Sequence, residues 1–386
     1  MRKVAVFTGT RAEYGLLCQV IKELDRSPEA ALQLIVGGMH LSPEFGYTVS
    51  KIEEDGYQIT ERLEFLLSSD SPVGISKSMG LALISAGECF ARIKPDLLVV
   101  LGDRFESLAV AQAAMVAQIP IAHIHGGETT EGLIDEAVRH SLTKMSHLHF
   151  TTTEPYRKRV IQLGEAPERV FNVGAPGVDN VHQLKLLDRD ELSSELQFSL
   201  GDKFFLVTYH PVTLEKDGGV ASFQKFLQAL DYFPEYKVIL TYPNADTYGR
   251  LLFDYIEEYR KRWRDRIFVT QSLGQVRYLS ALKHSTAVLG NSSSGLIEAP
   301  AFHVPTVNIG NRQRGRIAGE SVLHCEDSVE VMKDAITKVV SVDFQKYCST
   351  LKNPYGVGCA SSLIVETLLS YPLENIIQKS FYDIEF

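Results

Sequence analysis

Short apolar runs alternate with helix-like segments along the whole chain. In its first half these runs cover residues 4–7, 32–38, 97–103, 120–125 and 148–153. They are almost continuously apolar and do not alternate with polar positions, which is typical of strands buried on both faces of a parallel sheet. Strands of this kind, separated by helical segments, predict βαβ units and a doubly wound α/β sheet.

The same pattern starts again after a polar stretch without a strong strand at residues 174–202. The apolar runs of the second half are residues 204–210, 236–242, 265–270, 286–291 and 304–310. We therefore predict two Rossmann-like domains, residues 1–178 and 200–358, that face an interdomain cleft. The amphipathic segment 359–386 is predicted to form a C-terminal helix that crosses back to the first domain.

Composition and charge narrow the class of protein. Of the 386 residues, 45% are hydrophobic and 23% charged, which favours a packed core over disorder. The net charge of −9 makes general nucleic-acid binding a poor prediction. No apolar run approaches the roughly 20 residues of a membrane span. The 5 cysteines contain no CxxC pair, which favours free thiols in a reducing cytoplasm over disulfides or a zinc site.

Candidate chemistry lies where the apolar runs end, because ligands of doubly wound sheets bind outside the carboxyl ends of the strands. The motif GTRAEYG follows the first run, and its glycine turn with Arg11 suits an anion. The alternative is an ordinary turn with a surface arginine. Asp103 follows the run that ends at Leu101, with Arg104 beside it. Asp103 is predicted to face the cleft, or alternatively to cap the next helix.

The segment HIHGGETTEGLIDEAVRH places His125, Glu128 and Asp135 close together in sequence. Its double glycine permits close approach to a ligand, and its titratable groups indicate an acid/base site. His123 and His125 could face one side of a strand as a metal pair, but no third histidine has zinc spacing, so no metal is predicted. The alternative for Asp135 and Glu136 is a structural role in the first turn of a helix.

The second domain offers candidates for binding phosphate. His210 ends its first apolar run, and the motif GNSSSGLIEAP then supplies Ser292, Ser293, Ser294 and Gly295. Serines that enter a helix N-terminus can cradle a phosphate, and Glu298 further along can accept bonds from ribose hydroxyls. Arg312, in the motif GNRQRGR, can neutralise a diphosphate. The alternatives are a structural histidine, a serine helix cap and a solvated loop.

Taken together, the ordered motifs resemble the UDP-N-acetylglucosamine 2-epimerases, in particular the hydrolysing branch that opens bacterial sialic acid synthesis. The motifs are GTRAEYG, LGDR, HIHGGE, DE-x-x-RHS-x-TKMS, QLGE, HP-x-T, NAD, GNSSSGLIE, NIG-x-RQ-x-GR and NPYG. The resemblance spans nearly the whole chain. It implies the two-domain glycosyltransferase-B fold, no cofactor, and a homo-oligomer that is a dimer or a tetramer.

The resemblance also implies a reaction. UDP leaves C1 of UDP-GlcNAc while the C2 proton is removed, and water adds to the resulting 2-acetamidoglucal with inverted C2, which releases N-acetylmannosamine and UDP. Because the C2 proton is not acidic, positive charge must build at C1, and clustered carboxylates suit this chemistry. The alternatives are the same chemistry on UDP-N,N'-diacetylbacillosamine, a non-hydrolysing epimerase, a glycosyltransferase and a non-catalytic nucleotide-sugar-binding protein.

Matching motifs assign roles to individual residues. The implied catalytic residues are Asp103, His125, Glu128, Asp135 and His210. The implied substrate-binding residues are Arg11, Arg104, His210, Asn244, Ser292, Ser293, Ser294, Gly295, Glu298 and Arg312. The chain departs from the family at His125, where many relatives carry a catalytic glutamate in an H-I-E-G-G pattern. Either His125 takes the C2 proton, or Glu128 does so.

Overall fold

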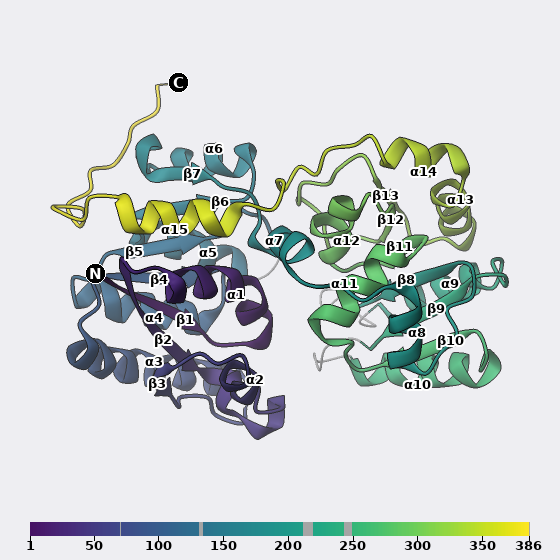
Figure 1. Cartoon of the computed structure of the whole chain (residues 1–386), viewed down its shortest axis with the longest axis horizontal. Coiled ribbons are helices and arrows are strands. Elements are labelled where there is room, and N and C mark those ends of the chain that lie inside the picture. Colours follow the sequence, from purple (N-terminus) through teal and green to yellow (C-terminus); the bar gives the residue numbers. More distant parts are fainter. Residues whose placement is uncertain (70, 131–133, 211–218, 243–248, 386) are drawn as a thin grey trace. The chain divides into compact units, whose positions relative to one another are not determined.

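The computed structural model describes residues 1–69, 71–130, 134–210, 219–242 and 249–385. The chain divides into two compact units (Figure 1). Unit 1 consists of Met1–Asn180 and Tyr355–Phe386, and unit 2 consists of Val181–Pro354. The units therefore change at residues 180–181 and 354–355. Unit 1 ends near the predicted residue 178 and unit 2 ends near the predicted residue 358, but unit 2 begins at Val181 and not at residue 200.

Unit 1 is built on a parallel sheet which, in the described residues, has 7 strands in the order β3-β2-β1-β4-β5-β6-β7. The strands are β1 (Arg2–Thr8), β2 (Ala30–Gly37), β3 (Ile59–Leu63), β4 (Leu97–Leu101), β5 (Ile121–Ile124), β6 (Leu148–Thr151) and β7 (Val170–Asn172). The helices are α1 (Arg11–Arg26), α2 (Val49–Glu54), α3 (Pro72–Ile93), α4 (Phe105–Val116), α5 (Ile134–Met145), α6 (Glu154–Gln162) and α15 (Ala360–Ser370), and α7 (Pro176–Gln183) runs across the change of unit at residues 180–181. Short 3₁₀ turns lie at Gly38–Leu41, Pro43–Phe45 and Pro167–Arg169.

Unit 2 repeats this plan with a sheet of 6 strands, again counted over the described residues, in the order β10-β9-β8-β11-β12-β13. The strands are β8 (Phe204–Thr208), β9 (Lys237–Thr241), β10 (Ile267–Thr270), β11 (Ala287–Gly290), β12 (Thr306–Ile309) and β13 (Val322–Cys325). The helices are α8 (Arg189–Leu196), α9 (Val220–Leu230), α10 (Gly249–Arg262), α11 (Gly274–His284), α12 (Ser294–Ile297), α13 (Val329–Val339) and α14 (Val342–Cys348), with a 3₁₀ turn at Ala299–Phe302.

Burial on both faces explains why the central strands are so apolar. Successive side chains of a strand point to opposite faces of its sheet. In β1, Val4 and Val6 belong to the core cluster that contains residues of α1 and α15, whereas Ala5 and Phe7 pack in the cluster formed with α3 and α4. Every residue of β4, β5 and β6 is buried. The predicted fold of two Rossmann-like domains of the glycosyltransferase-B type is confirmed.

One part of the predicted organisation needs correction. The polar stretch 174–202, predicted only to join the domains, contains α7 and α8. Helix α8 starts with a capping box in which the side chain of Asp188 accepts bonds from the backbone of Asp190 and Glu191. Its leucines, Leu192 and Leu196, belong to a core cluster of unit 2. This stretch is therefore part of the packed structure.

The order of the strands fixes where a site can form. In each sheet the strand order reverses beside the first strand, between β1 and β4 in unit 1 and between β8 and β11 in unit 2. Ligands of such sheets bind at this switch point, beyond the carboxyl ends of the strands. The loops that follow β1, β4, β5, β8 and β11 are therefore the places to look for chemistry.

The C-terminal part of the chain completes unit 1. Helix α15, drawn in yellow in Figure 1, packs against α1 through Ile364 and Leu368. Beyond it, Lys379 lies 2.8 Å from the buried carboxylate of Glu165. The same carboxylate bonds His149 Nε2 at 3.0 Å and Lys144 Nζ at 2.6 Å. Glu165 thus ties the C-terminal segment to β6 and α5.

This cluster predicts a loss of stability in acid. Burial alone would raise the pKa of Glu165, but the bonds from His149 and the two lysines outweigh it and lower the pKa from 4.5 to about 2. A carboxyl group with a depressed folded-state pKa stabilises the protein above pH 4.5, and this contribution is lost as pH falls toward 2. Melting temperatures measured across this range should fall more steeply for the wild type than for Glu165→Gln. Equal slopes would contradict the assignment.

Candidate active site

Asp103 lies at the carboxyl end of β4 without capping the next helix. Gly102 has a positive φ of 77° and turns the chain, and Arg104, not Asp103, occupies the N-cap position of α4. The Asp103 carboxylate instead forms an ion pair with Arg139 of α5. Its side chain remains 25% exposed, so one side of it can still meet a ligand.

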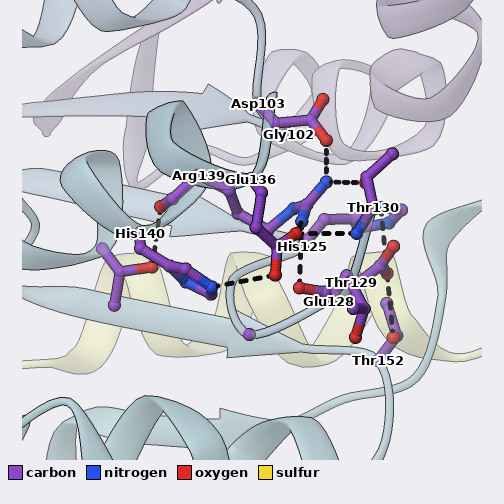
Figure 2. A network of polar contacts seen from close by, with 12 residues as sticks. Gly102, Asp103, His125, Glu128, Thr129, Thr130, Glu136, Arg139, His140 and Thr152 are labelled. Atoms are coloured by element: carbon purple, nitrogen blue, oxygen red, sulfur yellow. Dashed lines mark hydrogen bonds and ion pairs between the residues drawn. The ribbon is translucent and has the colours of Figure 1, made fainter. Parts of the chain in front are cut away.

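The loop after β5 brings His125 and Glu128 together. The Nδ1 atom of His125 lies 3.4 Å from Glu128 Oε1, which also accepts a bond of 3.1 Å from Thr152 Oγ1 (Figure 2). His125 has a φ of 69°, in the left-handed region that disfavours side chains, as is often found at functional sites. Its Nε2 atom is buried and lacks a hydrogen-bond partner among the described residues. A buried nitrogen without a partner is unusual and makes His125 a candidate for contact with a ligand.

Helix α5 contributes two acidic groups of different character. Burial raises the pKa of Asp135, and the nearby Asp103 carboxylate raises it further. For Glu136, the bond from the Thr130 amide and the charge of Arg139 overcome the effect of burial and lower the pKa. Both acids stand in the first turn of α5, as the structural alternative predicted. Environments that shift two carboxyl groups in opposite directions are typical of acid/base sites.

The turn after β1 differs from its prediction. The backbone N–H groups of Gly9 and Thr10 donate to Glu13 Oε2 at 2.8 and 3.1 Å, so they are already occupied. Burial, followed by the neighbouring Glu106 carboxylate, raises the pKa of Glu13 to about 7. Arg11 is the first residue of α1 and is exposed, so only its side chain remains a candidate for anion binding there.

Arg104 is held by a buried acid of its own helix. Its Nε atom donates to Glu106 Oε1 at 2.7 Å, and Glu106 is 1% exposed. The negative charge of Asp135 also helps to raise the pKa of Arg104. The guanidinium is therefore fixed beside the carboxyl end of β4, within the electrostatic reach of the candidate acids.

In unit 2 the ends of β8 and β11 are tied together. The His210 N–H donates to Asn291 Oδ1 at 2.7 Å, and Asn291 Nδ2 donates back to His210 O at 2.8 Å. Burial lowers the pKa of His210 to about 3, and the charge of Arg312 acts in the same direction. The imidazole is therefore neutral at ordinary pH. Its Nδ1 is buried without a partner in the described residues.

The serine motif forms a short turn and not the longer helix that was predicted. Helix α12 spans only Ser294–Ile297, and Glu298 is its C-cap residue, so this acid does not lie inside a helix. Ser293 occupies the N-cap position but makes no side-chain cap bond, whereas Ser292 Oγ accepts a bond of 3.4 Å from the Ser294 N–H at the start of the helix, as a capping serine would. Burial raises the pKa of Glu298. Gly295 is needed here because a Cβ atom would lie 2.6 Å from Thr306 Cγ2.

Arg312 and Gln313 support the same edge from the loop after β12. Arg312 Nη1 and Gln313 Nε2 both donate to the Asn291 carbonyl, at 3.2 and 2.8 Å. The predicted site residues of unit 2 that are described, from His210 to Arg312, thus come together at its switch point. Asn244, also predicted to bind the substrate, lies outside the described residues.

Within the part of the chain that the structure describes, no group of three or more His, Cys, Asp or Glu side chains is placed to hold a metal ion. His123, considered as half of a metal pair, is fully buried and bonds the Gly102 carbonyl at 2.7 Å. None of the described helices combines the length and the apolar character that crossing a membrane requires.

Arg139 is the most important site residue that the sequence analysis missed. Its side chain is 1% exposed and contacts Asp103, Glu136, the Glu128 carbonyl and Thr130. The sequence signals only its pairing with Glu136, because residues three positions apart share one face of a helix; this spacing indicates neither the burial of Arg139 nor its contact with Asp103. Glu13 was missed as well, although Thr10-x-x-Glu13 has the spacing of a capping box, which the structure contains.

Comparison with known proteins shows the family of this chain. The model of the family described as UDP-N-acetylglucosamine 2-epimerase matches residues 22–369. The chain belongs to the UDP-N-acetylglucosamine 2-epimerase family. Its members are enzymes that act on nucleotide sugars, so the resemblance predicted from the ordered motifs is confirmed at this level.

Several similar proteins have names that specify a reaction or a pathway. The chain is 37% identical to the GDP/UDP-N,N'-diacetylbacillosamine 2-epimerase (hydrolyzing) of Campylobacter jejuni, over 99% of each chain. It is 39% identical to the polysialic acid biosynthesis protein P7 of Escherichia coli, over 100% of this chain and 98% of that one. It is also 37% identical to the UDP-N,N'-diacetylbacillosamine 2-epimerase (hydrolyzing) of Legionella pneumophila, over 98% of each chain.

Solved structures share the fold of this family member. The UDP-GlcNAc 2-epimerase of Neisseria meningitidis, bound to UDP-GlcNAc, superposes with a TM-score of 0.80 over 96% of this chain and 100% of that one. The sequence identity is 20%, so this likeness concerns the fold alone.

Proposed function

We propose that this family member is a hydrolysing 2-epimerase, which converts a UDP-2-acetamido sugar and water into UDP and the free 2-epimeric sugar. The observation that supports it most is the group of acid and base side chains at the carboxyl ends of β4 and β5. There His125 Nδ1 lies 3.4 Å from Glu128 Oε1, and the charge of the Asp103 carboxylate helps to raise the pKa of Asp135. Such a group suits the removal of a proton from carbon.

In the proposed first step, the C1–O bond to UDP and the C2–H bond both break. The electrons of the C2–H bond form the C1–C2 double bond of a 2-acetamidoglucal, and the electrons of the C1–O bond leave with UDP. His125 Nε2, which is buried and unpartnered among the described residues, accepts the C2 proton, and Glu128 stabilises the imidazolium that forms. Asp135 stabilises the positive charge that develops at C1.

In the second step, water adds to the glycal. The water oxygen bonds C1 and loses a proton to Asp103, while a proton from the solvent joins C2 on the face opposite to the one from which His125 removed the first proton, which inverts this centre. The protons held by His125 and Asp103 return to the solvent. We assign Asp103 to the addition of water, because its carboxylate is fixed by Arg139 and remains partly exposed. The balance is one UDP-sugar and one water consumed, and one UDP and one free sugar formed.

Unit 2 is proposed to bind the nucleotide. His210, Ser292, Ser293 and Arg312 lie at its switch point, where ligands of such sheets bind. The neutral imidazole of His210 can bond a phosphate oxygen without carrying charge, while Arg312 supplies the positive charge that favours departure of a diphosphate.

The proposal is tested by incubating the purified protein with UDP-GlcNAc in H₂¹⁸O or D₂O. We expect release of free UDP and N-acetylmannosamine, with deuterium at C2 and ¹⁸O at C1 of the product. Formation of UDP-N-acetylmannosamine without free UDP would show a non-hydrolysing epimerase. Transfer of the sugar to an added acceptor alone would show a glycosyltransferase.

A second sugar must be tested in parallel. The Campylobacter and Legionella relatives are named for UDP-N,N'-diacetylbacillosamine, which favours a 2,4-diacetamido substrate. The name of the Escherichia coli relative favours sialic acid synthesis, for which N-acetylmannosamine from UDP-GlcNAc is the precursor. The two sugars differ at C4 and C6, so the ratio of their kcat/KM values decides between them.

Replacing Glu298 tests the proposed nucleotide site. Glu298→Ala should weaken UDP binding by about 1–3 kcal/mol, or roughly 5- to 150-fold in Kd, because it removes charge-assisted bonds to the ribose. Calorimetric titration with UDP measures this change. Glu235→Ala, an exposed acid of the same unit, is the matched control and should bind UDP as the wild type does. Wild-type affinity in Glu298→Ala would remove Glu298 from the site.

A further inference from the structure

The loop that contains His125 and Glu128 is held from two sides by two arginines. From α6, Arg159 Nη1 donates to the Gly127 carbonyl at 2.5 Å and to Thr129 Oγ1 at 2.6 Å. From α5, Arg139 donates to the Glu128 carbonyl at 2.9 Å and to Thr130 Oγ1. The contacts alternate along the loop, with residues 127 and 129 bound by one arginine and residues 128 and 130 by the other.

The arginines supply hydrogen-bond donors to backbone carbonyl groups of the loop. Strand β5 ends at Ile124, so the carbonyl groups that follow no longer have a neighbouring strand to bond. Gly127 has a φ of 77°, and a Cβ atom there would lie 2.4 Å from the Tyr156 carbonyl, so the loop runs directly against α6. A guanidinium group is planar with several fixed donors and can bind two acceptors at once, which an ammonium group does less rigidly.

Arg139 extends the same restraint to the other candidate catalytic groups. It forms ion pairs with Asp103, after β4, and with Glu136 of α5 at 2.6 Å (Figure 2). Glu136 in turn accepts a bond of 2.7 Å from the Thr130 N–H. A buried cation with these partners couples the position of the Asp103 carboxylate to that of the loop.

We propose that Arg139 and Arg159 are positioning residues, which form a clamp that holds the loop 125–130 and the Asp103 carboxylate in one geometry. The clamp acts through His125, Glu128 and Asp103 and needs no contact with the sugar. This inference rests on the proposed function, in which these three groups perform the chemistry. Misplacement of a reacting group by about 1 Å can lower a rate by roughly 100-fold, so loss of the clamp should appear in kcat.

The first test uses Arg159→Met, with Arg157→Met as the matched control. Arg157 lies on the same helix and donates to the carbonyls of Val170 and Pro167, away from the loop. We expect Arg159→Met to lower kcat by roughly 10- to 100-fold with a nearly constant KM and UDP affinity, and Arg157→Met to keep the wild-type kcat. An unchanged kcat in Arg159→Met, or an equal loss in both variants, would overturn the proposal.

The second test restores the missing group at Arg139. Arg139→Ala should lose more activity than Arg159→Met, because it also frees Asp103, and added guanidinium ion should recover part of the kcat while an equal concentration of sodium chloride should not. Failure of guanidinium to raise kcat in a folded Arg139→Ala protein would count against the clamp. If Arg139→Ala does not fold, the paired Arg159 and Arg157 variants decide the question.

A third measurement does not depend on activity. Amide hydrogen exchange of the peptide that contains residues 125–130 should be faster in Arg159→Met than in the wild type and unchanged in Arg157→Met, because the loop opens locally when its bonds are removed. Equal exchange in all three proteins would refute the clamp. Should the wild type release UDP from neither sugar, the proposed function fails, and this measurement still tests the clamp.

Discussion

Replacing His125 with alanine is expected to lower kcat by roughly 10²- to 10⁴-fold and to abolish exchange of the C2 hydrogen with solvent, the effect typical of a lost general base. The reason is geometric. His125 Nε2 is buried and has no partner among the described residues, whereas Glu128 already uses Oε1 for Thr152 and His125. Glu128 is thus better placed to orient the imidazole than to reach a substrate carbon.

Three variants separate these roles. His125→Glu should restore part of the exchange, because a carboxylate at this position can also accept a proton, as the family resemblance implies for the H-I-E-G-G pattern. Glu128→Gln should lower kcat less than His125→Ala, since it removes only the orienting charge. His182→Ala, an exposed histidine of α7, serves as the control. Deuterium at C2 of recovered substrate and of trapped glycal measures the exchange, and UDP titration reports whether each variant still binds the nucleotide.

The opposite pattern would reassign the base. If His125→Ala keeps near-normal exchange while Glu128→Gln loses it, Glu128 removes the proton. Alanine suits the left-handed backbone of residue 125 no better than histidine does, so the variant does not relax the loop as a glycine would. A loss of exchange can therefore be attributed to the missing imidazole.

The second large effect is expected from Gly290→Ala at the end of β11. A Cβ atom at this position would lie 2.1 Å from the Thr208 carbonyl oxygen, and the φ of 132° is one that alanine rarely adopts. Strain of the backbone costs roughly 1–3 kcal/mol, and overpacking against a rigid neighbour costs roughly as much again. The variant should therefore unfold at a clearly lower denaturant concentration and bind UDP weakly, because Asn291 no longer meets His210.

Gly80→Ala is the matched control for this prediction. Gly80 lies in α3, and a Cβ atom added there would have no neighbouring atom within 4 Å, so alanine should leave stability unchanged or raise it by roughly 0.4–1 kcal/mol. Denaturant midpoints and UDP titration compare the three proteins. Wild-type stability in Gly290→Ala would mean that β11 and β8 do not approach as closely as described.

The sequence predicted the interior strands and the edge strand β10, which lies in the run 265–270, but it missed the edge strands β3, β7 and β13. Strand β4 is apolar throughout and β5 is apolar except for His123, because both faces of the sheet are covered, and this leaves a plain pattern in the sequence. Strand β3 alternates exposed and partly buried residues, β7 has only three, and β13 is buried only at its ends. At an edge, burial no longer demands a continuous apolar run, so little remains to detect.

Some residues of the candidate site could be predicted from the sequence and others could not. Asp103 and His125 were predictable because each follows a buried strand, and strand ends of a parallel sheet lie on one edge. Arg139 could not be predicted as a site residue, because arginine is rarely buried and an arginine in a helix is expected to have a solvated side chain. Its burial depends on four acceptors that lie up to 36 residues away in sequence, and only the folded chain brings them together.

The return of residues 355–386 to unit 1 has a consequence for the order in which the molecule is made. Unit 2 is one continuous stretch and can assemble as soon as it leaves the ribosome. Helix α1 contacts β1 and β2 as well as α15, and its packing against α15 can form only when Ile364 and Leu368 have been synthesised. At about 5–20 residues per second this delay is roughly 20–70 s. During that time the core of unit 1 lacks the side chains that α15 contributes, although the N-terminal sheet is made first.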